Sequence, residues 1–120
     1  MSSVRRRWTS FDPEVTNKEA AALPSLDRKR LFRAMKAYVS EEESKCVVKN
    51  YGGGLYMIKD RSQGQGRCLY FTRILEQAPQ ALNPEPVENL VALVFYKKES
   101  QETPGQILET ARARLREALS

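Results

Sequence analysis

Apolar and polar positions along the chain follow two periods, one typical of strands and one typical of helices. Residues 90–95 (LVALVF) form a short apolar run rich in β-branched side chains, which predicts a strand buried on both faces. Residues 55–61 alternate, with Tyr56 and Ile58 on one face and Met57, Lys59 and Arg61 on the other. A loop containing two glycines, at 62–66, then returns the chain into a further strand at 67–72.

Helical spacing occurs in three segments. Residues 16–23 are good helix formers and Pro24 ends them, after which Ser25 is a suitable cap for a helix over 26–42. In that helix Leu31, Met35 and Tyr38 recur at three- and four-residue spacing, which predicts a face packed on a core. The last helix begins at Thr103-Pro104-Gly105-Gln106, where Thr103 is a predicted N-cap, Pro104 a first helical residue and Gln106 the other half of a capping box. Its predicted apolar stripe consists of Ile107, Leu108, Ala111, Leu115, Ala118 and Leu119.

These elements predict an α+β fold in a single domain, residues 1–120. The order is a first strand at 4–11, a turn or N-cap at Asp12-Pro13, an N-terminal helical hairpin, a small mostly antiparallel sheet and a C-terminal helix. We expect one layer of sheet with the helices covering one face. Residues 46–51 are ambiguous, the three glycines at 52–54 predict a tight turn or hinge, and 75–89 predict a long proline-rich loop.

The composition is that of an ordinary globular domain. With 120 residues, 41% hydrophobic and 29% charged, the chain can bury a core without disulfides or metal. No apolar run approaches the roughly 20 residues of a transmembrane helix, and the first residues lack the apolar centre of a secretory signal. Two cysteines without metal-ligand spacing favour reduced thiols, so we expect a cytoplasmic protein with no membrane partner.

Histidine is absent and the charge is basic. The chain has no histidine, which excludes a Ser-His-Asp triad, a histidine-based nuclease and the usual zinc hydrolase sites. Twenty Lys and Arg against fifteen Asp and Glu give a formal charge of +5, which favours a polyanionic partner. Charge alone does not choose between nucleic acid and an acidic protein.

Two groups of cations are predicted at strand ends. If the hairpin closes across 62–66, Arg67 comes near the face that carries Lys59 and Arg61. Tyr96, Lys97 and Lys98 follow directly after the apolar strand, where a phenol and two cations form a candidate anion site. The arginines at 5–7 have two interpretations, a solvated edge that discourages strand aggregation or a contact for phosphate.

Four short motifs in this order resemble the RelE/HigB-type toxins of bacterial type II toxin–antitoxin systems, closest to a branch of phage-derived proteins. The resemblance covers residues 25–119 and is strongest over 54–72 and 90–116. The motifs are 54–59 (GLYMIK), 66–71 (GRCLYF), 93–98 (LVFYKK) and 103–104 (TP) leading into 107–112 (ILETAR).

The resemblance implies a function and its partners. It implies a toxin that cleaves mRNA on the ribosome, as an endoribonuclease needing no metal and no other cofactor, and that a cognate antitoxin protein inhibits. In such enzymes the ribose 2′-hydroxyl attacks the adjacent phosphate, a base removes its proton, cations stabilise the phosphorane and an acid protonates the leaving 5′-oxygen.

The resemblance also suggests roles for individual residues. Lys59 is the candidate base, because neighbouring cations lower the pKa of a lysine. Arg67 is the candidate phosphate ligand. Lys97 or Lys98 is a candidate acid or second clamp, and Tyr96 is a candidate for base stacking or proton donation. The candidate RNA-binding residues are Arg5, Arg7, Arg61 and Arg112.

The sequence departs from the family pattern and leaves alternatives open. Met57 stands where some members carry a further basic residue, and Asp60, Glu99 and Glu102 dilute the charge. The alternatives are a ParE-like protein that binds a protein target such as gyrase without cleaving RNA, and a nucleic-acid-binding module. From the basic charge we predict that the antitoxin presents an acidic or amphipathic segment to the basic face or to the sheet edge.

Overall fold

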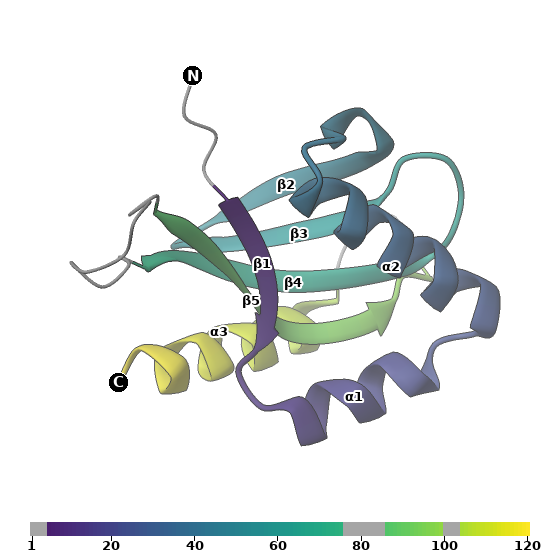
Figure 1. Ribbon diagram of the computed structural model, residues 1–120. Helices are drawn as coiled ribbons and strands as arrows, with labels where there is room; N and C mark the ends of the chain where they lie inside the picture. The colour runs from purple at the N-terminus through teal and green to yellow at the C-terminus, as the bar shows by residue number, and fades with distance from the viewer. Residues whose placement is uncertain (1–4, 76–85, 100–103) are drawn as a thin grey trace.

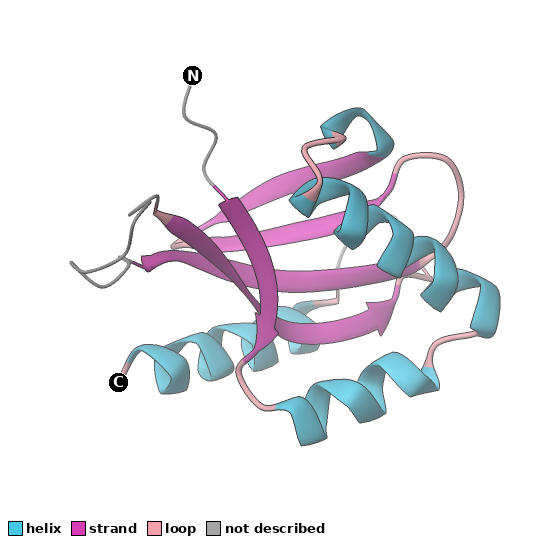
Figure 2. Ribbon diagram, viewed as in Figure 1, coloured by secondary structure: helices cyan, strands magenta, loops and turns pink. Residues whose placement is uncertain are grey.

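In a computed structural model, which describes residues 5–75, 86–99 and 104–120, five strands form one sheet with helices on either side of it (Figure 1, Figure 2). The elements in chain order are β1 (Arg5–Ser10), α1 (Pro13–Ala22), α2 (Ser25–Val39), the 3₁₀ turn η1 (Glu43–Lys45), β2 (Cys46–Gly52), β3 (Leu55–Asp60), β4 (Gly66–Leu75), β5 (Val87–Lys97) and α3 (Gly105–Leu119). No helix in these ranges is both long and apolar enough to cross a membrane.

The strand order is β1-β5-β4-β3-β2. β1 lies parallel to β5, and every other neighbouring pair is antiparallel. The predicted α+β class and the mostly antiparallel sheet are therefore confirmed. Residues 46–51, ambiguous in sequence, belong to the edge strand β2.

Each face of the sheet has its own core. On one face Leu31, Ala34 and Met35 of α2 pack with Ile58 and Tyr70. On the other face the side chains of α3 pack on the sheet, and the buried members of this second core are Leu55, Met57, Leu69, Phe71, Val91, Leu93, Val94, Tyr96, Ala111 and Leu115. The expectation that the helices cover one face was wrong, because α3 returns behind the sheet while α2 crosses in front of it (Figure 1).

Several predicted boundaries shift. The first helix begins at Pro13, where Asp12 is the N-cap and its carboxylate accepts from Glu14 N at 3.2 Å. The second begins at Ser25 with Pro24 as N-cap and ends at Val39, before the predicted 42. In the third, Pro104 is the N-cap and Gly105 the first helical residue, while Thr103 lies outside the described residues. Leu119, predicted in the apolar stripe, is exposed.

Both ends of the predicted proline-rich loop belong to strands. β4 continues to Leu75 and β5 begins at Val87, so both ends of the predicted loop 75–89 are strand; residues 76–85 lie outside the described residues. The tight turn at 52–54 is confirmed, since all three glycines have positive φ. At Gly66, the start of β4, the backbone packs closely on α2, since a Cβ there would stand 3.0 Å from Asp27 O.

A bulge in β5 decides which side chains face which core. Tyr70 pairs with Ala92 and Leu69 with Val94, so that Leu93 is an extra residue on β5. As a result Leu93 and Val94 both pack on the α3 face, and the alternation beyond them is reversed. Phe95 packs on the α2 face and Tyr96 on the α3 face.

Beyond the end of β1, two charged side chains cover the edge of β5. Arg114 of α3 donates to Leu93 O at 2.7 Å, Glu19 of α1 accepts from Phe95 N at 3.2 Å, and the two side chains form an ion pair at 2.8 Å. They supply the donor and the acceptor that a neighbouring strand would otherwise provide. We refer to Glu19 and Arg114 as the edge pair.

Candidate functional site

A single row across four strands brings the predicted catalytic residues together. Val47 of β2 pairs with Lys59 of β3, and Arg67 of β4 pairs with Tyr96 of β5. Ile58 pairs with Cys68, so the next position along places Lys59 opposite Arg67. Neighbours in such a row have Cβ atoms about 5 Å apart. Lys59, Arg67 and Tyr96 therefore lie side by side on the α3 face.

Arg67 is a buried cation. Its side chain is only 8% exposed, and its Nη1 donates to Gly64 O at 2.9 Å and to Gly66 O at 3.0 Å. Its Nε is buried without a hydrogen-bond partner. No ion pair among the described residues includes Arg67. Burial lowers the pKa of Arg67, against the opposing effect of Tyr96, Tyr51 and Asp27. A buried guanidinium without a bound carboxylate is costly, and the two backbone carbonyls offset only part of that cost.

The surroundings of Lys59 change the pKa of its amine. Partial burial and then the positive charges of Arg67, Lys49 and Lys98 lower the pKa of Lys59 below its ordinary value. No carboxylate is bonded to Lys59 among the described residues. Lowering the pKa increases the fraction of neutral amine at a given pH, which is the form that accepts a proton.

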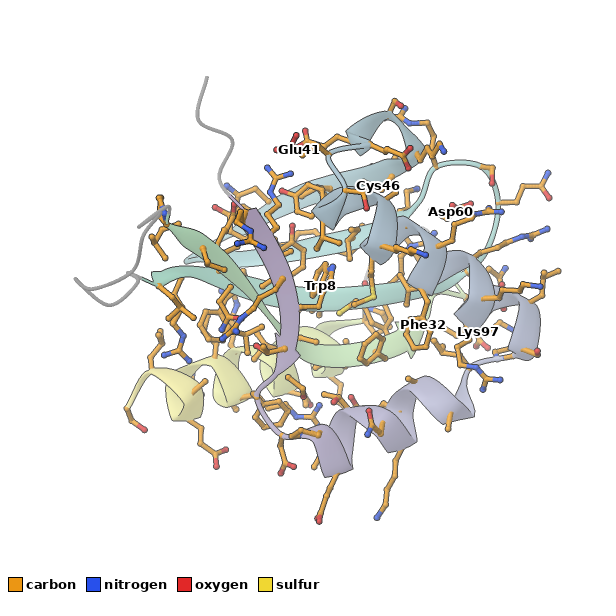
Figure 3. All side chains as sticks on the ribbon, viewed as in Figure 1. Trp8, Phe32, Glu41, Cys46, Asp60 and Lys97 are labelled. Atoms are coloured by element: carbon orange, nitrogen blue, oxygen red, sulfur yellow. The ribbon has the colours of Figure 1, made fainter. Side chains whose placement is uncertain are left out.

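The structure separates the two adjacent lysines at the end of β5. Lys98 lies two residues beyond Tyr96, its backbone N donates to Gln65 O at 2.7 Å, and its charge acts on Lys59. Lys97 instead pairs with Gly66, whose Cβ position faces Asp27 and Leu31 of α2. Lys97 is therefore exposed on the α2 face at the end of β5 (Figure 3), and of the predicted pair only Lys98 belongs with Lys59. We use the name cationic row for the cations Lys59, Arg67 and Lys98 together with Tyr96, which lies next to Arg67.

The position of Tyr96 favours one of the two roles that were predicted for it. Its side chain is 6% exposed and packs in the core under α3, so its ring has no open face on which a base could stack. Tyr96 pairs with Arg67 across β4 and β5, and it opposes the lowering of the Arg67 pKa. Of the two roles considered for Tyr96, proton donation fits this position better than stacking.

Three of the predicted RNA-binding arginines lie away from the cationic row. Arg61 donates to Cys46 O at 3.3 Å and lines a hollow with Arg33 and Lys45 beside α2. Arg5 and Arg7 are exposed on β1 and pair with Val87 and Asn89, at the opposite end of β5 from Tyr96.

Arg112 has a structural contact. Its guanidinium donates to Tyr51 O at 3.3 Å and to Gly52 O at 3.5 Å, and so it ties α3 to the turn between β2 and β3. In this position Arg112 holds the glycine turn against α3, and its contact with RNA stays a prediction.

Two further residues, Lys49 and Tyr51 of β2, lie at the site although no sequence motif indicated them. Lys49 pairs with Met57, which places it on the α3 face beside Lys59, and its charge contributes to the lowered pKa of Lys59. Tyr51 packs at the edge of the same core and interacts with Arg67. The alternation of Val47, Lys49 and Tyr51 along β2 is the sequence signal for both.

Over the parts of the chain that the structure describes, no group of three or more acidic, cysteine or histidine side chains is placed to hold a metal ion. In comparisons with known proteins, no protein-family model and no curated protein sequence matches the chain.

Proposed function

We propose that this protein is the toxin of a bacterial type II toxin–antitoxin system, an endoribonuclease that cleaves mRNA on the ribosome in the cytoplasm. The observation that carries the proposal is the juxtaposition of Lys59 and Arg67 on the α3 face, with no bonded carboxylate among the described residues and with the pKa of Lys59 lowered by burial and by like charge. The motifs that resemble RelE/HigB-type toxins supply the identity of the substrate.

In the proposed reaction Lys59, as the neutral amine, takes the proton of a ribose 2′-hydroxyl. The 2′-oxygen forms a bond to the adjacent phosphorus and the bond from phosphorus to the 5′-oxygen breaks, which leaves a 2′,3′-cyclic phosphate and a 5′-hydroxyl. Arg67, Lys98 and Lys49 supply positive charge while the phosphorane carries its extra negative charge. Lys98 or Tyr96 gives a proton to the leaving 5′-oxygen.

The lowered pKa of Lys59 is compatible with the proposed chemistry and also with phosphate binding. Crowded cations lower the pKa of a lysine in any phosphate-binding surface while the anion is absent. A general base gains from the same shift, because more of the amine is neutral near pH 7.

The proposal is tested by mapping mRNA ends after induced expression and in a purified translation reaction. We expect cuts that follow the reading frame on translated messages, with 2′,3′-cyclic phosphate on the upstream fragment. A DNA-damage response without RNA cuts would favour the ParE-like alternative, and RNA binding without growth inhibition would favour a binding module.

A further inference from the structure

A hollow at the end of β3 is formed by four segments of the chain. Its volume is about 420 Å³, and it is lined by Arg33, Ser44, Lys45, Asp60, Arg61 and Ser62. These residues belong to α2, to η1, to the end of β3 and to the loop after β3. Asp60 lies beside α2 (Figure 3), whereas the preceding residue Lys59 points to the α3 side. The Asp60 hollow and the cationic row therefore lie on opposite faces of the sheet.

Asp60 is a buried carboxylate that holds two of the lining residues in place. It is 8% exposed, and its Oδ2 accepts from Arg33 Nη2 at 3.2 Å, from Ser62 N at 3.3 Å and from Ser62 Oγ. Burial alone would raise the pKa of Asp60, but the hydrogen bonds from Ser62 and Arg33 outweigh it and lower the pKa below its ordinary value. The carboxylate is therefore ionised at neutral pH, and it orients Arg33 toward the hollow.

Arg61 joins the loop after β3 to η1. Its backbone N donates to Lys45 O at 3.3 Å, and its Nη2 donates to Cys46 O at 3.3 Å. These bonds fix the backbone that carries Lys45 and Arg61 before any ligand binds. A set of cations that is already held together loses less conformational entropy on binding.

The lining has a net positive charge. Three cations, Arg33, Lys45 and Arg61, stand against the single carboxylate of Asp60, which leaves a net charge of two. Lys45 also pairs with Glu42 at 3.4 Å, but both side chains are more than half exposed, so this pair contributes little. No ion pair among the described residues includes Arg61.

The chemistry of the lining indicates the class of ligand. No lining residue has an apolar side chain, so the hollow offers no contact to the apolar anchors of a protein segment. Guanidinium groups match the paired oxygens of a phosphate. A phosphate monoester carries a charge of about −1.5 to −2 at pH 7, which matches the lining, whereas each phosphodiester of RNA carries one negative charge. Small-molecule sites measure roughly 300–1,000 Å³, so the hollow has room for the phosphate and part of the group that carries it.

We propose that the Asp60 hollow binds a phosphate dianion, either inorganic phosphate or the terminal phosphate of a small monoester. The inference does not depend on RNA cleavage, because the hollow and the cationic row share no residue.

The test is an NMR titration of the ¹⁵N-labelled full chain at constant ionic strength and about pH 7.5, where the dianion predominates. The ligands are inorganic phosphate, ribose 5-phosphate, dimethyl phosphate as a diester and succinate as a dicarboxylate. We expect the backbone amides of Ser44, Lys45, Arg61 and Ser62 to shift and saturate with the first two ligands. Their affinity should exceed that of dimethyl phosphate and of succinate at least about tenfold. Tighter binding of ribose 5-phosphate than of inorganic phosphate identifies a monoester as the ligand, and the opposite order identifies the free ion.

Matched variants assign the binding to the hollow. Arg61→Gln and Lys45→Gln each remove one cation and should weaken phosphate binding about tenfold. Arg116→Gln, at an exposed arginine of α3, is the control and should leave the affinity unchanged. Circular dichroism of each variant checks that it is folded.

Three results would overturn the proposal. One is a set of shifts confined to the amides of the cationic row, and another is equal binding of dimethyl phosphate and ribose 5-phosphate. The third is full phosphate binding by both Arg61→Gln and Lys45→Gln. Since none of these measurements involves cleavage, their failure is distinguishable from a failure of the proposed nuclease activity.

Discussion

Lys97 and Lys98 are neighbours of the same type, and they differ mainly in the face of the sheet on which they lie. Lys98 acts on Lys59, whereas Lys97 pairs with Gly66 on the α2 side. Lys98→Ala should therefore lower the single-turnover cleavage rate about 10- to 100-fold, the range for losing one charge that stabilises a transition state. Lys97→Ala should leave the rate within about twofold of wild type. A larger loss of rate in Lys97→Ala than in Lys98→Ala would show that the strand register does not define the site.

The lowered pKa of Lys59 predicts a direction for the pH profile. If the neutral amine is the base, the cleavage rate rises with pH and levels off below the ordinary lysine pKa of 10.5. Removing the positive charge of Lys98 should raise the pKa of Lys59 and move the rising limb to higher pH. Single-turnover rates of wild type and Lys98→Ala from about pH 6 to pH 9 measure this shift. If the cleavage rate rises at the same pH in wild type and Lys98→Ala, the group that titrates is not Lys59.

The same shift has a consequence for stability. The folded protein binds the Lys59 proton less tightly than the unfolded chain, so between the folded and unfolded pKa values the unfolded state carries more protons. The contribution of Lys59 to the free energy of unfolding therefore rises with pH through that window, and below it Lys59 lowers stability. Lys59→Met should raise the melting temperature at pH 7 while it removes cleavage, and thermal unfolding monitored by circular dichroism checks it. A lower melting temperature for Lys59→Met would contradict the repulsion inferred for this site.

At the scale of elements, the edge pair holds the end of β5. Glu19→Ala leaves Phe95 N without its acceptor and removes the ion pair of Arg114, which keeps its bond to Leu93 O. We expect it to lower the free energy of unfolding by about 1–3 kcal/mol. Glu109→Ala, at an exposed glutamate of α3, is the matched control and should change it by less than about 0.5 kcal/mol. Urea unfolding of both variants measures the difference. Equal effects would mean that the edge pair is only a surface ion pair.

The sequence predicted the register of the hairpin β3–β4 better than that of β5. A short glycine-containing loop joins β3 to β4, so closure of this hairpin predicted that Arg67 lies near Lys59, and the register confirms it. β5 is apolar on both faces, so its sequence carries no period of two that would reveal the bulge at Leu93. For this reason Lys97 and Lys98 could not be separated.

Other features depend on contacts between distant parts of the chain. The edge pair joins residues 95 positions apart in sequence. The burial of Arg67 and the contact of Arg112 with the glycine turn depend on where α3 packs, and nothing in the local pattern of α3 indicates which face of the sheet it covers.

In the molecule as a whole, the sheet divides two basic surfaces with different chemistry. The cationic row combines a buried arginine and a lysine of lowered pKa, which suits proton transfer at a phosphate. The outward side of α2 carries the exposed cations Lys29, Arg33 and Lys36 together with the exposed Leu26 and Phe32. The formal charge of +5 is thus distributed over two faces.

The most direct test of the proposed function is the single-turnover cleavage rate of ribosome-bound mRNA by wild type, Lys59→Met and Arg67→Lys. Arg67→Lys keeps a positive charge and loses the guanidinium fork, and circular dichroism checks that both variants are folded. We predict that each lowers the rate at least about 100-fold and that wild type leaves 2′,3′-cyclic phosphate ends. Rates close to wild type in both folded variants would contradict the assignment of catalysis to the cationic row.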